Sequence, residues 1–238
     1  MENNFEIFRQ ADKTASLAEA GENFNALLID NKKRSILLML SAGSALSILD
    51  YVGPNSLGEN LTVSMLDERF SQAADVNNFL QFQKLDFYKD ALTNGASFFG
   101  TLPRFDDTMD SLKQRWEKNL KTWRTENPNG IIIATLGMGP DGHTAGIFAN
   151  DDEKEFDKLF IGDNWITAYD VGNKHQYKER ITTTLTFFKN IDFGIGFVSG
   201  PEKKPKLDEL IANQSPTNQF PASSWHEIKN VKIFTDIN

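Results

Sequence analysis

The sequence predicts an α/β fold, with a mostly parallel sheet and helices on both of its faces. Short, nearly continuous apolar segments recur along the chain, and amphipathic or helix-opening segments separate them. Unbroken apolar strands are typical of parallel sheets, because both faces of such sheets are buried. The 238 residues are 39% hydrophobic and 24% charged, which suffices for one large core. We therefore expect a single domain over residues 1–238.

The first half of the chain predicts helices and strands in alternation. Residues 5–29 carry apolar side chains at loosely helical spacing, which favours a helix. The run "RSILLML" at 34–40 predicts a buried strand, and small residues then open a turn and a helix over 41–52. The run "NLTVSML" at 60–66 predicts the next strand.

The second half continues the alternation. Apolar residues recur every three or four positions from Asp106 to Glu126, which predicts an amphipathic helix with Asp106 as its N-cap. The run "GIIIATL" at 130–136 is the most apolar strand candidate of the chain. Further strands are expected at 165–171, 193–200 and 231–236, and further helices at 201–212 and 223–228.

Composition excludes several classes of function. The formal net charge is −8 and the basic residues are scattered, so we expect no nucleic-acid partner and no anionic membrane surface. The absence of cysteine excludes disulfides, thiolate metal sites and a cysteine nucleophile. The N-terminal segment "MENNFEIFRQ" lacks the features of a signal peptide, and no apolar run approaches the roughly 18 residues of a membrane helix. A cytoplasmic location is expected.

A glycine-rich loop, "LGMGPDGHTAGIF", follows the most apolar strand. Ligands of open parallel sheets gather at the carboxyl ends of strands, and Gly137, Gly139 and Gly142 allow close approach of a ligand to the backbone there. Asp141 is expected to orient a neighbour. We expect His143 to open the next helix, where the helix dipole would disfavour the charged ring. Residue chemistry alone leaves two equal alternatives for His143, a general base or a helix-opening residue.

The same loop is similar to the signature of the 6-phosphogluconolactonase family, which belongs to a superfamily that also contains glucosamine-6-phosphate deaminase. Other segments resemble the family's motifs in the family's order. They are "LSAGSA" at 40–45, "LDERF" at 66–70, "NNF" at 77–79, "ERITTTL" at 179–185, "SGPEKKPKL" at 199–207 and "FPASSW" at 220–225. The first of these departs from the family's Gly-Gly-Ser-Thr-Pro, because Ala45 and Leu46 replace the last two residues.

The resemblance implies a modified Rossmann-like fold and the hydrolysis of 6-phospho-D-glucono-1,5-lactone to 6-phosphogluconate, a step of the pentose phosphate pathway. It implies that His143 acts as a general base with Asp141 as the second catalytic residue. The remaining implied site residues bind the substrate and its phosphate (Gly43, Ser44, Arg69, Arg180 and Lys203) or support the loops (Asp67, Gly139 and Gly142). No cofactor or metal is expected, and the expected assembly is a monomer or a small homo-oligomer.

Alternatives stay open for single residues and for the whole chain. Arg69 could form a surface ion pair, Arg180 could be solvated and Lys203 could belong to a basic helix face. His175 and His226 are interpreted as ordinary surface or interface histidines. A deaminase would have a glutamate after the histidine, where this chain has "AGIF", and a sugar-phosphate sensor would need a DNA-binding segment.

Overall fold

The computed structural model describes residues 4–238, and a parallel sheet forms its centre. Residues 1–3, the start of the segment considered for a signal peptide, lie outside the described residues. Within the described range, seven strands make this sheet in the order β1-β10-β9-β6-β2-β3-β5, and all neighbouring pairs are parallel. The strands are β1 Asn4–Arg9, β2 Ile36–Leu40, β3 Leu61–Met65, β5 Ser97–Phe98, β6 Ile131–Leu136, β9 Phe193–Val198 and β10 Asn230–Thr235. The predicted fold class is confirmed.

A smaller antiparallel sheet was not anticipated. Within residues 4–238 it consists of three strands in the order β4-β8-β7, where β4 is Asp67–Arg69, β8 is Glu179–Thr183 and β7 is Ile166–Asp170. The strand expected at 165–171 therefore exists, but it belongs to this sheet. Its neighbour β8 brings the "ERITT" segment beside β4, although the two lie more than 100 residues apart in sequence.

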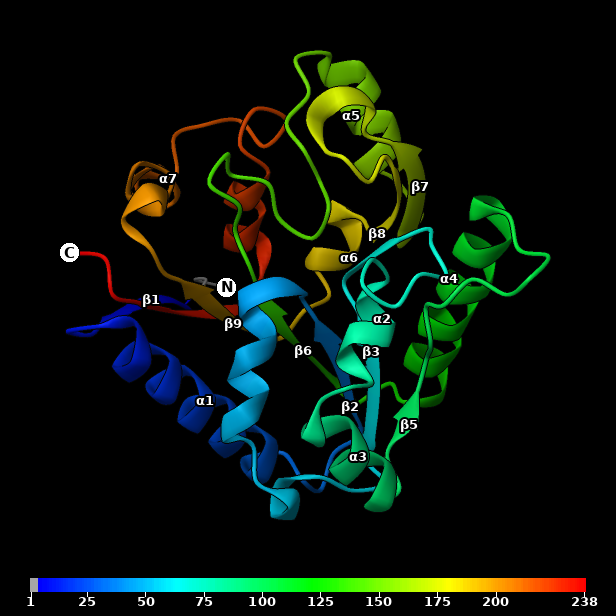
Figure 1. The fold of residues 1–238 in the computed structure, drawn as a ribbon, viewed down its shortest axis with the longest axis vertical. Helices are drawn as coiled ribbons and strands as arrows, with labels where there is room; N and C mark the ends of the chain where they lie inside the picture. The colour runs from blue at the N-terminus through cyan, green and yellow to red at the C-terminus, as the bar shows by residue number, and fades with distance from the viewer. Residues whose placement is uncertain (1–3) are drawn as a thin grey trace.

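Helices flank the central sheet, which runs between α1 on one side and α4 on the other (Figure 1). Helix α1 packs against β9 and β10, and α4 packs against β7 and β8. The α-helices are α1 Lys13–Asp30, α2 Asn78–Phe82, α3 Asp86–Thr93, α4 Met109–Glu126, α5 Glu153–Phe160, α6 Leu185–Phe188 and α7 Lys204–Ala212. The 3-10 helices are η1 Gly43–Tyr51, η2 Pro54–Ser56, η3 Gly172–Lys174, η4 Pro201–Lys203 and η5 Pro221–Glu227.

Two predicted helix starts are wrong. The expected helix over 5–29 begins only at Lys13, after an N-cap formed by Asp12, because the preceding residues form β1. This strand pairs with β10, and the ring of Phe8 stacks on Phe234 with 5.0 Å between ring centroids. Such a partner from the far end of the chain is invisible to local periodicity. Helix α4 begins at Met109, because Thr108, and not Asp106, forms the N-terminal capping box.

Candidate active site

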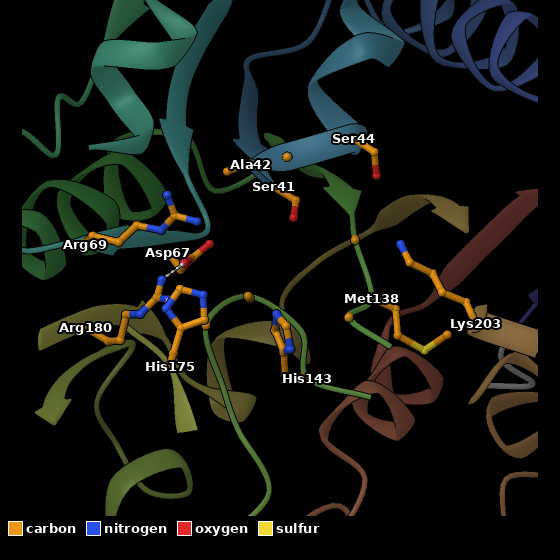
Figure 2. Close-up of a pocket in the computed structure, with 15 residues that line it drawn as sticks. Ser41, Ala42, Ser44, Asp67, Arg69, Met138, His143, His175, Arg180 and Lys203 are labelled. Carbon is orange, nitrogen blue, oxygen red and sulfur yellow. Dashed lines mark hydrogen bonds and ion pairs between the residues drawn. The ribbon is translucent and has the colours of Figure 1, made fainter. Parts of the chain in front are cut away.

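A cavity of about 210 Å³ opens where β2, β3 and β6 end (Figure 2). Its first wall follows β2, its second follows β3 and continues into β4, and its third is the glycine-rich loop after β6. Residues of β8, of the segment before it and of η4 complete the wall. The lining residues are Ser41, Ala42, Gly43, Ser44, Asp67, Arg69, Gly137, Met138, Gly139, His143, Ala145, Gly146, His175, Arg180 and Lys203.

His143 does not open a helix, contrary to the sequence-based expectation. The chain turns irregularly around it, and the next helix, α5, begins only at Glu153. A compact turn positions His143, since the Gly139 N–H donates to the His143 carbonyl at 2.9 Å and the Gly142 N–H donates to the Gly139 carbonyl at 3.0 Å. Gly142 adopts φ +86°, a conformation that favours glycine. The helix-dipole argument therefore does not apply to this ring.

Asp141 and Phe148 hold the imidazole of His143 instead. The Asp141 Oδ1 lies 2.5 Å from His143 Nδ1 and also accepts the backbone N–H of His143 at 3.2 Å. The ring of Phe148 stacks on the imidazole with 4.5 Å between centroids. Burial raises the pKa of Asp141, but the hydrogen bond and charge of His143 outweigh it and bring that pKa below its ordinary value. An ionised Asp141 favours the tautomer with the proton on Nδ1, which leaves the Nε2 lone pair of His143 for a proton transfer.

Buried hydroxyls fix the chain just after His143. Ala145 adopts the left-handed φ of +45°, and its carbonyl accepts a hydrogen bond from Thr182 Oγ1. The Thr144 hydroxyl donates to the Gly137 carbonyl at 2.8 Å and accepts from Trp225 Nε1 at 3.0 Å. A non-glycine residue in this conformation persists only where its surroundings impose it, and such residues cluster at functional sites. The histidine loop is thus held from several elements.

Arg180 is a buried cation whose donors are largely engaged. It is 2% exposed, and Asp67 Oδ2 lies 3.3 Å from its Nη1. Its Nε donates to the Tyr177 carbonyl at 3.1 Å, and its Nη2 lies 3.0 Å from His175 Nδ1. Burial lowers the pKa of Arg180 from its ordinary value, and the charge of Asp67 opposes this effect. The alternative of a solvated Arg180 is excluded.

Arg69 has more donors to offer to a ligand. Its Nη1 donates to the Val76 carbonyl at 2.9 Å, and its guanidinium lies over the ring of Tyr177, 5.6 Å from the centroid. Its Nε is buried and has no hydrogen-bond partner within residues 4–238. Arg69 also forms no ion pair in that range, so the alternative of a surface ion pair finds no support. Its Nη2, for which residues 4–238 supply no acceptor, remains available to a ligand in the cavity.

Glu68, the residue between Asp67 and Arg69, holds β4 in place through hydrogen bonds of its carboxylate. Its Oε1 accepts the backbone N–H groups of Arg69 at 2.8 Å and Asn78 at 2.6 Å. Its Oε2 accepts from the Phe79 N–H at 3.0 Å and from Thr101 Oγ1 at 2.7 Å. Burial raises the pKa of Glu68 to about 7, although these four hydrogen bonds oppose the rise.

Lys203 lies on the other side of His143 from the two arginines, and Ser41, Ala42 and Ser44 of the loop after β2 face His143 across the cavity (Figure 2). Lys203 lines the cavity, and burial is the main cause that lowers its pKa from its ordinary value. The adjacent Lys204 points elsewhere, since its Nζ lies 3.7 Å from Asp208 and donates to the Asn238 carbonyl. Of Lys203 and Lys204, only Lys203 therefore contributes charge to the cavity.

Gly43 adopts φ +69° at the start of η1, and Ser44 follows it.

The structure brings most of the sequence-predicted site residues together. Eight line the cavity, namely Gly43, Ser44, Asp67, Arg69, Gly139, His143, Arg180 and Lys203. Asp141 and Gly142 do not line it, and they support the His143 turn from behind. The interpretation of His175 as an ordinary surface histidine is wrong, because it lines the cavity beside Arg180. The sequence feature that points to His175 as a cavity residue is its position, five residues before the predicted site residue Arg180.

Residues 4–238 contain neither a membrane-spanning helix nor a candidate metal cluster. Over residues 4–238, no helix is both long and apolar enough to cross a membrane. Among the same residues, no three histidine or acidic side chains lie close enough together to form a candidate metal site.

Fold and cavity together define an α/β protein with a small, positively charged site at the carboxyl edge of a parallel sheet. The chain belongs to the family of glucosamine-6-phosphate isomerases and 6-phosphogluconolactonases, whose model matches residues 11–233. It is 29% identical over 124 residues to a 6-phosphogluconolactonase from Nostoc sp., a match that covers 51% of this chain and 48% of that protein. The matched part thus spans about half the length of the curated relatives.

Solved structures of the superfamily share the fold. A 6-phosphogluconolactonase from Plasmodium vivax superposes with a TM-score of 0.76 at 14% identity, covering 100% of this chain and 91% of that chain. A monomeric glucosamine-6-phosphate deaminase superposes with a TM-score of 0.74 at 15% identity, covering 97% and 96% of the two chains. At such identities the likeness establishes the fold and leaves the reaction to be argued from the site.

Proposed function

We propose that the protein hydrolyses 6-phospho-D-glucono-1,5-lactone to 6-phosphogluconate in the oxidative branch of the pentose phosphate pathway. The observation that carries the proposal is the His143 imidazole, which Asp141 orients toward a small cavity flanked by Arg69 and Lys203. Family membership and the 6-phosphogluconolactonase relatives support the choice of substrate. The glucosamine-6-phosphate family branch shares the fold, so the assay must separate the two.

The site residues divide into two tasks. Arg69 and Lys203, which lie on opposite sides of His143 (Figure 2), offer charge-assisted hydrogen bonds to the substrate and its phosphate, and the Ser44 hydroxyl and Gly43 amide add further donors. Arg180, paired with Asp67, supports this side of the cavity and keeps two donors for the substrate. Asp141, Gly139 and Gly142 keep His143 in place.

The reaction is general-base hydrolysis. His143 Nε2 takes a proton from water while the water oxygen attacks C1 of the lactone and forms a tetrahedral oxyanion. When the oxyanion collapses, the bond between C1 and the ring oxygen breaks, and the imidazolium returns the proton to that oxygen. Amides of the 137–142 loop are the candidate donors to the oxyanion. No covalent intermediate is required.

We further propose that residues 1–238 act as one domain without metal or nucleotide cofactor. The proposed setting is the cytoplasm, as a monomer or small homo-oligomer whose partner is the sugar phosphate and not nucleic acid. The negative net charge and the absence of cysteine support this assignment.

Initial rates of lactone opening near pH 6.5, with the enzyme-free rate subtracted, test the proposal. We expect metal-independent hydrolysis by the wild type, and a loss of about 10² to 10⁴ in kcat for His143→Asn with unchanged binding of 6-phosphogluconate. Ammonia release from glucosamine 6-phosphate without lactone hydrolysis would assign the protein to the deaminases. Activity abolished by chelation and restored by one divalent ion would exclude the metal-free mechanism.

A further inference from the structure

His175 presents an unassigned polar group to the cavity. Its Nδ1 lies 3.0 Å from Arg180 Nη2 and 3.1 Å from the backbone nitrogen of Tyr177. A guanidinium and a backbone N–H can only donate, so Nδ1 must be the acceptor of both. The neutral ring therefore carries its proton on Nε2, and the tautomer follows from the chemistry of its two partners.

The opposite ring nitrogen, Nε2, finds no acceptor among residues 4–238. No hydrogen bond from His175 Nε2 is found within the described chain, although Nδ1 makes two. Figure 2 shows one ring nitrogen of His175 turned to Arg180 and the other turned toward the open centre of the cavity. The ring also contacts Phe148, with 5.9 Å between centroids, and Phe148 stacks on His143. The donor is thus held on the same aromatic support as the proposed base.

The surroundings keep this donor neutral. Burial and the positive charges of Arg180 and Arg69 lower the pKa of His175 from its ordinary value, His143 adds to this effect and Asp141 opposes it. The Nε2–H of His175 is neutral and lies between Arg180 and His143. Such a donor suits an uncharged oxygen of the substrate, because Arg69 and Lys203 already offer charged donors for the phosphate.

We propose that His175 is a substrate-binding residue whose Nε2–H donates a hydrogen bond to an uncharged oxygen of the sugar, between the phosphate and the carbon that reacts. Arg180 and Tyr177 act on this contact by fixing the tautomer and the direction of the ring. The inference rests on the proposed function, because it takes a sugar-phosphate lactone as the occupant of the cavity.

Two substitutions separate the donor from the acceptor of His175. In His175→Asn the side-chain oxygen can replace Nδ1 as the acceptor for Arg180, but the donor at Nε2 is lost. In His175→Gln the longer amide can place an N–H near the position of Nε2. His226→Asn is the matched control, since His226 lies outside the cavity and stacks on Phe5. Thermal unfolding of each variant checks that it folds.

We expect His175→Asn to lower kcat/KM about 3- to 10-fold, mostly through KM, and by the same factor for 6-phosphogluconolactone and unphosphorylated gluconolactone. His175→Gln should lie closer to the wild type, and His226→Asn should match it. Wild-type kinetics in His175→Asn would overturn the proposal. A loss confined to the phosphorylated lactone, or His175→Gln no better than His175→Asn, would also overturn it, because the ring would then act only through Arg180.

Equilibrium binding of 6-phosphogluconate by calorimetry keeps the two proposals distinguishable. The same 3- to 10-fold weakening in His175→Asn, about that of one neutral hydrogen bond, supports the contact even if the wild type fails to hydrolyse the lactone. In that case only the proposed reaction fails. Unchanged affinity for 6-phosphogluconate overturns the His175 contact while leaving the reaction standing.

Discussion

Arg69 and Arg180 are direct partners in the antiparallel register of β4 and β8. Directly opposite residues point to the same face of a sheet, and both of these side chains line the cavity. Asp67 forms an ion pair with Arg180 at 3.3 Å, and it leaves Arg69 without an ionic partner within residues 4–238. Like charges placed opposite each other are destabilising, so this pair is expected where an anion is to be bound.

Arg69→Ala should therefore impair the phosphorylated substrate selectively. A lost charge-assisted contact costs about 1.5 to 3 kcal/mol, which corresponds to a fall of roughly 10- to 150-fold in kcat/KM for 6-phosphogluconolactone. Unphosphorylated gluconolactone should be affected much less. Arg104→Ala is the control, since Arg104 is exposed and does not line the cavity. Equal losses on both lactones would show that Arg69 acts on the lactone and not on the phosphate.

Lys203 and Lys204 are adjacent residues with different surroundings, which makes them a matched pair. Lys203→Ala should raise the KM for 6-phosphogluconolactone about tenfold or more, because it removes a half-buried cation from the cavity. Lys204→Ala removes an exposed pair with Asp208 and a hydrogen bond to the Asn238 carbonyl, both outside the cavity, so its kinetics should match the wild type. Similar kinetics of the two variants would contradict the assignment of Lys203 and favour a general basic helix face.

The sequence predicted the central sheet better than the small one. The inner strands β2 and β6 of the central sheet are almost wholly apolar, and all of their residues are buried. Strand β4 has only three residues, Asp67, Glu68 and Arg69, so no hydrophobic periodicity could reveal it. Its burial depends on hydrogen bonds to α2 and to Thr101, which local sequence does not encode.

Most of the site residues predicted from the sequence line one cavity, and the two wrong expectations, for His143 and His175, have physical causes. The helix expected at His143 is absent because hydrogen bonds of Thr144 and Ala145 to Gly137 and Thr182 hold the chain in a tight turn. His175 was misread because its role depends on Arg180 and Phe148, and Phe148 lies far from it in sequence. Motif order could locate single residues, but side-chain partners across loops needed the structure.

Glu68→Gln should change how stability depends on pH. The folded-state pKa of Glu68 is about 7, against 4.5 for the unfolded chain, so the folded protein holds a proton that the unfolded protein releases in this range. Binding of this proton adds up to about 3 kcal/mol to the free energy of unfolding of the wild type, fully so below about pH 4.5. The added stability is lost as the pH rises through 7. Urea unfolding from pH 5 to pH 8 measures the effect.

The variant itself should be less stable than the wild type at pH 5. Its amide nitrogen would face at least one backbone N–H that Glu68 now satisfies, at a cost of about 1 to 3 kcal/mol. Because glutamine does not titrate, the gap to the wild type should narrow as the pH rises to 8. A gap that stays constant or widens over this range would contradict the raised pKa of Glu68.

Gly139→Ala tests whether the turn holds His143 in its catalytic position. A Cβ at Gly139 would lie 2.2 Å from Cε1 and Nδ1 of His143 and 2.6 Å from Asp141 Oδ1, so the imidazole must turn away from Asp141. Because a misplacement of about 1 Å can cost roughly 100-fold in rate, kcat should fall by about that factor. The phosphate contacts lie elsewhere in the cavity, so the affinity for 6-phosphogluconate should stay within a few-fold of the wild type.

Gly53→Ala is the control, because its Cβ would meet only Asn25 Oδ1 at 4.0 Å, and its kcat should be unchanged. A folded Gly139→Ala protein with wild-type kcat would mean that the Asp141–His143 contact is dispensable for the reaction, and the general-base assignment of His143 would lose its structural support.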